Sequence, residues 1–379
     1  MKHYDYIFTG AGLSALMTVY EMVVSKQFQD KKILLLDSDS KKNNDRTWSF
    51  WEKNAGTFDD IVFKKYESAF FKNQNFSRKL DLNPYQYKTI RGVDFYNKVF
   101  DVLSLHPNIE FHNTIIQNFE ETTDGVNVQT NSGIFSGEKL FNSIYNPNLV
   151  ISQTKFPLVQ QHFIGWFIKS KEAVFTPETA TFMDFSIEQK GNTRFMYVLP
   201  TSETEALIEY TLFSPTLLSK EEYEAEIVNY IRNLGISDYE IVEKEQGNIP
   251  MTCYPFWKHN AKNILNIGST GGWTKASTGY TFKNTTKKSK EVVRFLQNHS
   301  DFRKFHKKDK FWFYDLLLID ILFHKNQLGS TIFASMFKTA KPALIFKFLD
   351  EETSFWEDLQ VIWQCPKMPF LQALWKRIF

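Results

Sequence analysis

The strongest constraint on the fold of this chain is a strand, glycine turn, helix and strand in its N-terminal segment. An apolar run, 4–9, leads into Gly10-Ala11-Gly12-Leu13-Ser14-Ala15, which fits the pattern G-x-G-x-x-G/A. Apolar periodicity predicts a helix from Leu13 to about Val24, and 32–36 predicts a second strand. Such glycines let the backbone approach a pyrophosphate, toward which the helix N–H groups point. The segment therefore predicts a Rossmann-like dinucleotide-binding unit.

The second strand of this unit ends in an acid, Asp37. It lies roughly 20–25 residues beyond the turn, where an acid binds the ribose hydroxyls of an adenosine. An ordinary tight turn between strand and helix explains the glycines but not this acid. Because the motif stands at the N-terminus, we expect FAD rather than a diffusible nicotinamide. Four residues are predicted to bind its ADP half: Gly10, Gly12, Ala15 and Asp37.

Composition excludes several classes of protein. A net charge of +2 argues against a nucleic-acid binder, which usually carries a strong basic excess. The two cysteines support neither a disulfide framework nor a zinc site, so we expect no metal and a reducing compartment. No window approaches the roughly 18 apolar residues that span a bilayer. The 37 Phe residues fit either a large core or a long apolar cavity or membrane-facing surface.

A second glycine segment follows a buried strand, 263–268, and runs from Ser269 to Phe282. Its strand, glycine-rich turn and helix start again form a nest of backbone N–H groups. Two such nests fit a cofactor that has a pyrophosphate and a second polar ring. The residues expected to approach the pyrophosphate and this ring are Gly268, Gly271, Gly272 and Gly279.

Arginine and tryptophan are concentrated in the segment Asp45–Glu52. This pairing suits an anion beside a flat ring, so we place Arg46 in the cofactor site. The alternative is a surface loop that an Asp45–Arg46 pair holds in place.

Residues 157–213 predict a second, antiparallel sheet with strands at 162–169, 180–186, 193–200 and 205–213. Period-two alternation puts Leu207, Glu209 and Thr211 on one face. A face that carries both Leu and Glu is either exposed to solvent or lines a cavity that contains one acid. Asp184 is a further acid among aromatic residues of this sheet.

The remaining segments complete an α/β architecture in three parts. We assign 1–75, 90–150 and 245–295 to a discontinuous FAD-binding domain that includes a β-meander at 109–143. The antiparallel-sheet substrate domain comprises 76–89 and 151–244. Residues 296–379 form a C-terminal helical region. There, four lysines precede the aromatic run 311–314, which fits either a membrane-surface helix or a charged cap on a core helix.

The chain resembles the bacterial lycopene cyclases, flavoproteins whose fold is similar to that of p-hydroxybenzoate hydroxylase. The resemblance spans nearly the whole length. Its motifs lie at 45–51, 161–166, 182–185, 207–211, 249–252, 271–282 and 348–351. Two departures are Ser49, where many relatives have Cys, and Ser269, where related flavoproteins often have Asp.

The resemblance implies a lycopene β-cyclase, in which the linear ψ-ends of lycopene close to β-ionone rings without net redox change. Glu209 falls on the family's acid–base glutamate. Asp184 is expected to help it or to shape the pocket, and the alternative is a structural hydrogen-bonding acid. Reduced FAD is the expected cofactor, and NAD(P)H only reduces it. The implied location is the cytoplasmic side of the membrane, as a peripheral, monotopic protein.

Two other functions remain open on the same scaffold. One is a redox flavoenzyme, either a monooxygenase or a polyprenyl reductase, which consumes NAD(P)H in proportion to product. The other is a carotenoid-binding accessory that keeps FAD as structure. The sequence leaves open whether one or both ends are cyclised, whether the ring is β or ε, and the oligomeric state.

Overall fold

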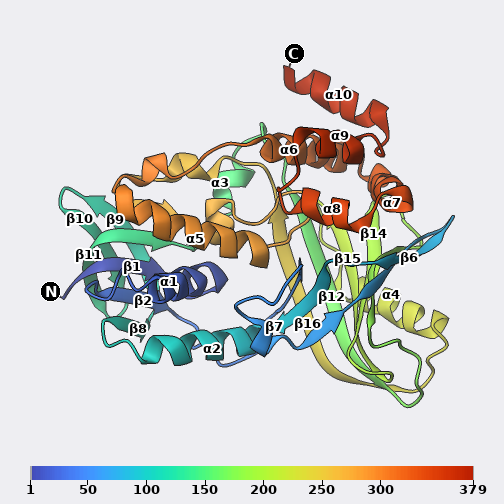
Figure 1. The fold of residues 1–379 in the computed structure, drawn as a ribbon, viewed down its shortest axis with the longest axis horizontal. Helices are drawn as coiled ribbons and strands as arrows, with labels where there is room; N and C mark the ends of the chain where they lie inside the picture. Colours follow the sequence, from blue (N-terminus) through green and yellow to red (C-terminus); the bar gives the residue numbers. More distant parts are fainter. Residues whose placement is uncertain (1, 379) are drawn as a thin grey trace.

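The computed structural model describes residues 2–378 and contains a nucleotide-binding half, a second sheet and a C-terminal helical layer (Figure 1). The first sheet has the strand order β8-β2-β1-β11-β10-β9, with β17 beside β11. Its strands are β1 (His3–Thr9), β2 (Ile33–Asp37), β8 (Ile109–Asn113), β9 (Ile116–Thr122), β10 (Gly125–Thr130), β11 (Gly133–Asn142) and β17 (Ile264–Asn266).

Parallel pairing dominates the centre of this first sheet. β1 pairs in parallel with β2 and β11, and β17 extends the parallel part. Of the meander predicted at 109–143, only β9, β10 and β11 are antiparallel neighbours, because β8 pairs in parallel with β2. The apolar core of this half joins the sheet to α1 (Leu13–Ser25), α2 (Gly92–Ser104) and α5 (Phe282–Asn298).

The second sheet has the order β16-β12-β15-β14-β13-β5-β6. It consists of β5 (Ser68–Asn73), β6 (Ser77–Asp81), β12 (Val159–Ser170), β13 (Thr179–Phe185), β14 (Thr193–Pro200), β15 (Glu205–Ser214) and β16 (Tyr239–Met251). All neighbours are antiparallel except β5 and β13, which are parallel. A small third sheet contains β3 (Thr47–Glu52), β4 (Lys64–Tyr66) and β7 (Gln86–Arg91).

Three predicted domain boundaries need correction. We assigned 1–75 to the FAD-binding domain, but β5 extends the second sheet because Phe71 is fully buried in that sheet's core. Residues 245–251 were also assigned to the FAD-binding domain, but they complete β16, which pairs with β12 as far as Met251. Conversely, 86–89 of the predicted substrate domain lie in β7 of the small sheet.

Helices cover the second sheet on both faces. On one face, α4 (Lys220–Asn233) begins with a capping box between Ser219 and Glu222 and packs an apolar stripe against the strands. The other face meets the C-terminal layer of α6 (Lys310–His324), α7 (Gly329–Thr339) and α8 (Pro342–Leu349). The short α3 (Asn148–Ile151) joins the two halves, and α9 (Phe355–Ile362) and α10 (Lys367–Ile378) end the chain.

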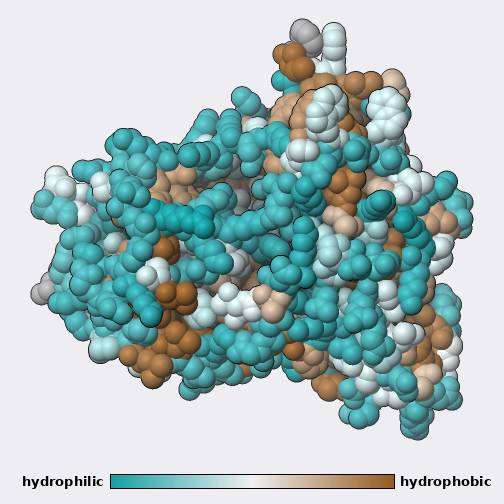
Figure 2. Space-filling view, in the orientation of Figure 1, coloured by the Kyte–Doolittle hydropathy of each residue, from teal (hydrophilic) through white to brown (hydrophobic). Residues whose placement is uncertain are grey.

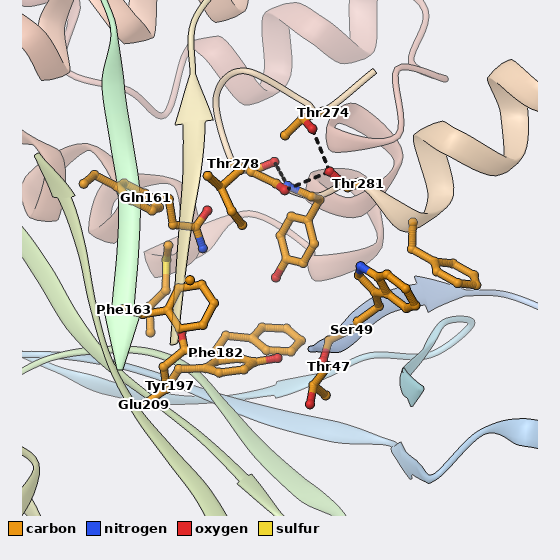
Figure 3. Close-up of a pocket in the computed structure, with 18 of the residues that line it drawn as sticks. Thr47, Ser49, Gln161, Phe163, Phe182, Tyr197, Glu209, Thr274, Thr278 and Thr281 are labelled. Carbon is orange, nitrogen blue, oxygen red and sulfur yellow. Dashed lines mark hydrogen bonds between the residues drawn. The ribbon is translucent and has the colours of Figure 1, made fainter. Parts of the chain in front are cut away.

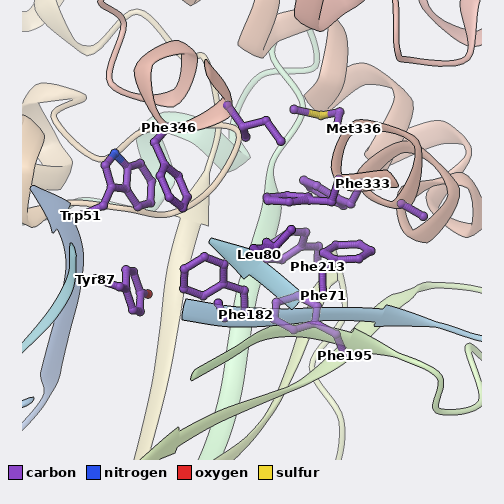
Figure 4. Close-up of a cluster of buried hydrophobic side chains, with 14 of the residues drawn as sticks. Trp51, Phe71, Leu80, Tyr87, Phe182, Phe195, Phe213, Phe333, Met336 and Phe346 are labelled. Carbon is purple, nitrogen blue, oxygen red and sulfur yellow. The ribbon is translucent and has the colours of Figure 1, made fainter. Parts of the chain in front are cut away.

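Aromatic side chains fill the contact between the second sheet and the C-terminal layer (Figure 4). Phe71 stacks on Phe337 of α7 with ring centroids 4.8 Å apart, and Trp51 stacks on Phe346 of α8 at 4.9 Å. Each such buried ring contributes about 1.5–3 kcal/mol through the hydrophobic effect. Buried phenylalanine is as abundant in the core of the first half as at this contact.

The lysine-rich segment before 311–314 precedes a core helix. Phe311, Leu316 and Ile319 of α6 are buried. The structure therefore agrees with the charged-cap alternative rather than with a membrane-surface helix at this position. Within residues 2–378, no helix combines the length and apolarity that crossing a bilayer requires.

Candidate active site

A cavity of about 460 Å³ lies where the nucleotide-binding half, the second sheet and the C-terminal helices meet. Figure 3 shows Glu209 and Tyr197 of the second sheet on one side of this cavity, with Thr278 and Thr281 of the second glycine segment on the other. Its apolar lining comes from both the sheet and the helices: Phe163, Phe182, Phe195, Phe213, Phe333, Phe337 and Phe346.

The first glycine turn has the geometry that a dinucleotide requires. Gly10 has φ +92°, and a Cβ there would lie 2.2 Å from Ser143 Oγ. At Gly12 the surroundings are open, with no atom within 4 Å of the point that a Cβ would occupy. No side chain caps the N-terminus of α1, so its first N–H groups remain available to a ligand, beside the buried Ala15. The turn thus fits a pyrophosphate that approaches at Gly12.

Asp37 lies at the end of β2, beside this turn. Its Oδ2 accepts a hydrogen bond of 2.6 Å from the backbone N–H of Ala11, and the ammonium of Lys41 is 3.3 Å away. The structure therefore brings together the acid and the glycines that the sequence predicted as an ADP-binding set.

The second glycine segment packs against the first. Gly268 has φ +63°, and a Cβ on it would come within 2.6 Å of Ser14 Oγ in the first turn of α1. Gly271 is the last residue of the short helix η3 (Gly268–Gly271), and Gly272 caps its C-terminal end. The segment then reaches the cavity wall at Gly279. The two glycine segments therefore lie against each other, and the second of them reaches the cavity.

Gly279 and its neighbours connect this surface to the second sheet. A Cβ at Gly279 would lie 2.0 Å from Gln161 Oε1 of β12. That oxygen is buried and has no hydrogen-bond partner within residues 2–378. A polar ring bound between the two segments would offer it a donor, which fits the cofactor predicted from sequence.

Arg46 lines the cavity next to Asp45, as the arginine and tryptophan pattern indicated. Its Nε donates a hydrogen bond of 3.0 Å to Asp45 Oδ2, while Tyr96 donates to Oδ1. The Arg46 side chain is 59% exposed, so it remains free to meet an anionic group at the cavity mouth. The alternative ion pair with Asp45 is thus present, and the position of Arg46 beside a cofactor stays a prediction.

Glu209 is the acid in the cavity wall. It lies on β15 and is only 8% exposed, and Thr211 on the same face donates a hydrogen bond to Oε1. Burial is the main cause that raises the pKa of Glu209, to about 8, and the charge of Glu245 adds to it. The Thr211 hydrogen bond acts in the opposite direction. A carboxyl in this environment keeps its proton at neutral pH.

Three tyrosine hydroxyls form a chain in the cavity wall. Tyr87 and Tyr197 are 2.5 Å apart, and Tyr87 and Tyr280 are 3.1 Å apart. Tyr197 is also the direct neighbour of Glu209 in the pairing of β14 with β15. These roles of Tyr87 and Tyr280 were missed, since an aromatic residue in a strand or loop gives no sequence signal of what it contacts.

Asp184 is not among the residues that line the cavity, which agrees with the alternative of a structural hydrogen-bonding acid. It is buried on the other face of β13, where Oδ2 accepts a hydrogen bond of 2.9 Å from Tyr230 of α4. Ser186 donates to Oδ1, and Lys72 lies 3.6 Å away. This acid anchors α4 to the second sheet.

Comparison with known proteins identifies the family. Residues 5–375 match the model of the family described as lycopene cyclase protein. The chain belongs to the lycopene cyclase family. It is 24% identical to the lycopene beta-cyclase of Pantoea ananas over 290 residues, which cover 73% of this chain and 71% of the relative.

Solved structures share the fold at much lower identity. A geranylgeranyl bacteriochlorophyll reductase-like protein from Thermoplasma acidophilum matches with a TM-score of 0.64 at 10% identity, covering 98% of both chains. An HpxO variant from Klebsiella pneumoniae in complex with FAD matches with a TM-score of 0.59 at 14% identity, covering 96% of this chain and 100% of the other. The lycopene cyclase therefore has the α/β fold of FAD-dependent enzymes with a C-terminal helical region.

Proposed function

We propose that this lycopene cyclase is a β-cyclase that closes the ψ-ends of lycopene by acid catalysis without net redox change. The observation that carries the proposal is Glu209, a buried carboxyl with a raised pKa in the wall of an aromatic cavity. Protonation of an alkene needs an acid that stays protonated in an apolar pocket, and burial provides this. The curated relative named a lycopene beta-cyclase supports the choice of product.

The steps balance without an oxidant or a reductant. Glu209 gives its proton to the terminal double bond, which leaves a tertiary cation. A neighbouring double bond attacks this cation, and a carbon–carbon bond closes the six-membered ring. Loss of a proton from the ring then forms the β-ionone double bond. Substrate and product are isomers, so one proton enters and one leaves for each ring.

The walls of the cavity suit the cationic intermediate. Aromatic faces attract positive charge, and an apolar lining keeps water from adding to the cation. Phe182 contacts Tyr87 edge to face, with ring centroids 4.6 Å apart, and Tyr87 holds the tyrosine chain. We infer that this wall stabilises the cation without reacting with it.

The residues described above fit FAD. Gly10, Gly12, Ala15 and Asp37 would hold its ADP half, and the segment from Gly268 to Gly279 with Arg46 would hold the flavin half. When bound in its reduced form, FAD supplies an electron-rich ring, and NAD(P)H serves only as its reductant. The chain's own task is to fix the position of this ring and to exclude water around Glu209.

We also propose a peripheral attachment to the cytoplasmic face of the membrane, through a surface that we call the C-terminal tryptophan face. It consists of Trp356, Leu359 and Trp363 of α9 and its end, and Met368, Leu371 and Trp375 of α10, all exposed. Apolar side chains gather over these helices at the top of Figure 2. Tryptophan beside lysine is typical of a lipid–water interface, and Lys367 lies 4.2 Å from the Trp363 ring.

A rival on the same fold is a redox flavoenzyme, since the Thermoplasma neighbour is named as reductase-like. The mass of the product separates the two. Purified protein with pre-reduced FAD is incubated with lycopene in D₂O, and the pigments are analysed by mass spectrometry. The proposal predicts a ring-ended isomer that carries deuterium from the acid. A product with added oxygen or with added hydrogen pairs contradicts it.

A further inference from the structure

A second glutamate, Glu245, stands beside Glu209 across a single glycine. β12 lies between β15 and β16, and Gly165 on β12 pairs with Glu209 on one side and with Glu245 on the other. Residues that pair directly across neighbouring strands point to the same face of a sheet. The three positions therefore form one row, with a carboxyl at each end and no side chain in the middle.

Both glutamate side chains lean over this glycine. A Cβ at Gly165 would lie 3.3 Å from Glu245 Cγ and 3.5 Å from Glu209 Cβ. Any larger residue at this position would therefore stand between the two chains. The nearest atom to that Cβ position is Leu207 Cδ1, at 2.9 Å, so the space over the glycine that the two glutamates share is apolar.

The surroundings of the pair provide hydrogen bonds but little positive charge. Glu209 accepts a hydrogen bond from Thr211, and Glu245 Oε2 accepts one of 2.8 Å from Thr47. Within residues 2–378, neither glutamate forms an ion pair. The titratable groups that face Glu245 are Glu209, Glu243 and Arg91, and Arg91 is itself paired with Glu243.

Among residues 2–378, the titratable groups that face Glu209 carry no positive charge. They are Glu245, Tyr197 and Tyr280, and both hydroxyls remain neutral because burial raises their pKa values above the usual range. Two carboxylates in such a site cannot both ionise at neutral pH, because each raises the cost of the other's charge. The two glutamates therefore titrate together, and each apparent pKa describes the pair rather than one residue.

We propose that Glu245 is a positioning residue that shares a proton with Glu209 across Gly165 and so keeps Glu209 protonated for ring closure. This inference rests on the proposed cyclase function. Glu245 is not part of the cavity lining, so it acts through Glu209 rather than on the substrate. When Glu209 gives its proton to the alkene, the pair gains one negative charge. The proton that the ring loses, or one from solvent, restores it.

The test is the pH dependence of ring closure by the holoenzyme with Glu245→Gln. The substitution removes the negative neighbour, so Glu209 loses its proton more easily and its pKa falls. Glu209 is then deprotonated at a lower pH than in the parent, so the alkaline limb of the kcat profile shifts by about one unit toward lower pH. We expect about a fivefold loss at pH 8 relative to the parent and little loss at pH 6.

Controls separate this effect from a structural one. Glu240→Gln makes the same chemical change on an exposed position of β16 and should leave the profile unchanged. Glu245→Asp keeps the charge and should retain the parent's alkaline limb. An alkaline limb of Glu245→Gln that coincides with the parent's overturns the proposal. If the parent forms no rings at any pH, the proposed function fails instead.

Infrared titration of the parent covers the case in which Glu245→Gln does not fold. The band of protonated carboxyls should persist above about pH 6 and disappear in two steps, as for an interacting pair. Glu209→Gln should remove one of these steps and lower the other. Two carboxyls that titrate independently in the ordinary range of glutamate contradict the sharing of a proton.

Discussion

At the scale of single residues, the two glycines of the first turn have different tasks. Gly10 has a left-handed backbone and no room for a side chain, since Ser143 Oγ occupies the Cβ position. Gly12 has φ −81° and open space around it. The protein itself therefore does not require glycine at position 12, whereas a closely approaching pyrophosphate does.

Gly12→Ala tests this difference. The added methyl group meets no atom of residues 2–378 within 4 Å but occupies the space through which the proposed cofactor would approach. We expect the flavin content of the purified protein, read from its visible absorbance, to fall about tenfold or more, which corresponds to a cost of about 1.4 kcal/mol or more in binding. The melting temperature of the apoprotein should stay within a few degrees of the parent's.

Gly10→Ala is the matched control, and it should destabilise the apoprotein because the left-handed backbone and Ser143 both oppose it. A Gly12→Ala protein that keeps its full flavin content shows that the cofactor does not approach at this turn.

The sequence predicted Glu209 but not its neighbour, for a physical reason. Alternation along β15 put Glu209 on a face with Leu207 and Thr211, and that face is the cavity wall. Glu245 lies on a different strand, and only the register of β12 with both neighbours shows that the two acids meet. The role of Asp184 stayed open because alternation along β13 does not say which face carries α4.

At the scale of helices and strands, α9 and α10 present exposed apolar side chains. In α9, Trp356, Leu359 and Trp363 recur at intervals of three and four residues and so share one face. A lipid surface fits this arrangement because the substrate class proposed for the cavity is a bilayer-soluble hydrocarbon. Exposed lysines such as Lys367 add attraction to anionic headgroups.

Replacement of both Trp356 and Trp363 by Ser should weaken binding to vesicles. Each tryptophan that leaves the interface gives up about 1.5–3 kcal/mol, so sedimentation with vesicles of anionic and neutral phospholipid should show at least a tenfold weaker affinity. Leu105→Ser removes an exposed apolar side chain at the end of α2 and should bind as the parent does.

Two outcomes would contradict the membrane attachment. One is equal vesicle binding by the parent and the double variant. The other is a parent that is dimeric in solution while the double variant is monomeric, which would assign the C-terminal tryptophan face to a second copy of the chain.

Element boundaries illustrate where sequence patterns fail. Both strands of the first βαβ unit, α1, and the four strands between 157 and 213 were predicted within one to three residues of their observed bounds. The assignment of β5 failed because it joins β13, more than a hundred positions later, through a parallel pairing. Local periodicity carries no information about such a partner, which is set by the burial of Phe71 between sheet and helices.

At the scale of the whole molecule, the cavity is a product of three parts that are distant in sequence. The second glycine segment supplies Thr278 and Gly279, and the second sheet supplies Glu209. The helices α7 and α8 close the far side with Phe333, Phe337 and Phe346. The sequence predicted the first two parts and their order. It could not predict the third, since the same aromatic residues would serve equally well in an ordinary core.

The central claim is that Glu209 delivers the proton that closes the ring, and pigment analysis tests it most directly. Lycopene-producing cells carry either the parent or Glu209→Gln, which keeps the size and the hydrogen-bond acceptor for Thr211 but has no acidic proton. We predict ring-ended carotenoid with the parent and unchanged lycopene with the variant, while both purified proteins retain flavin. Ring-ended carotenoid in cells that carry Glu209→Gln would contradict the account.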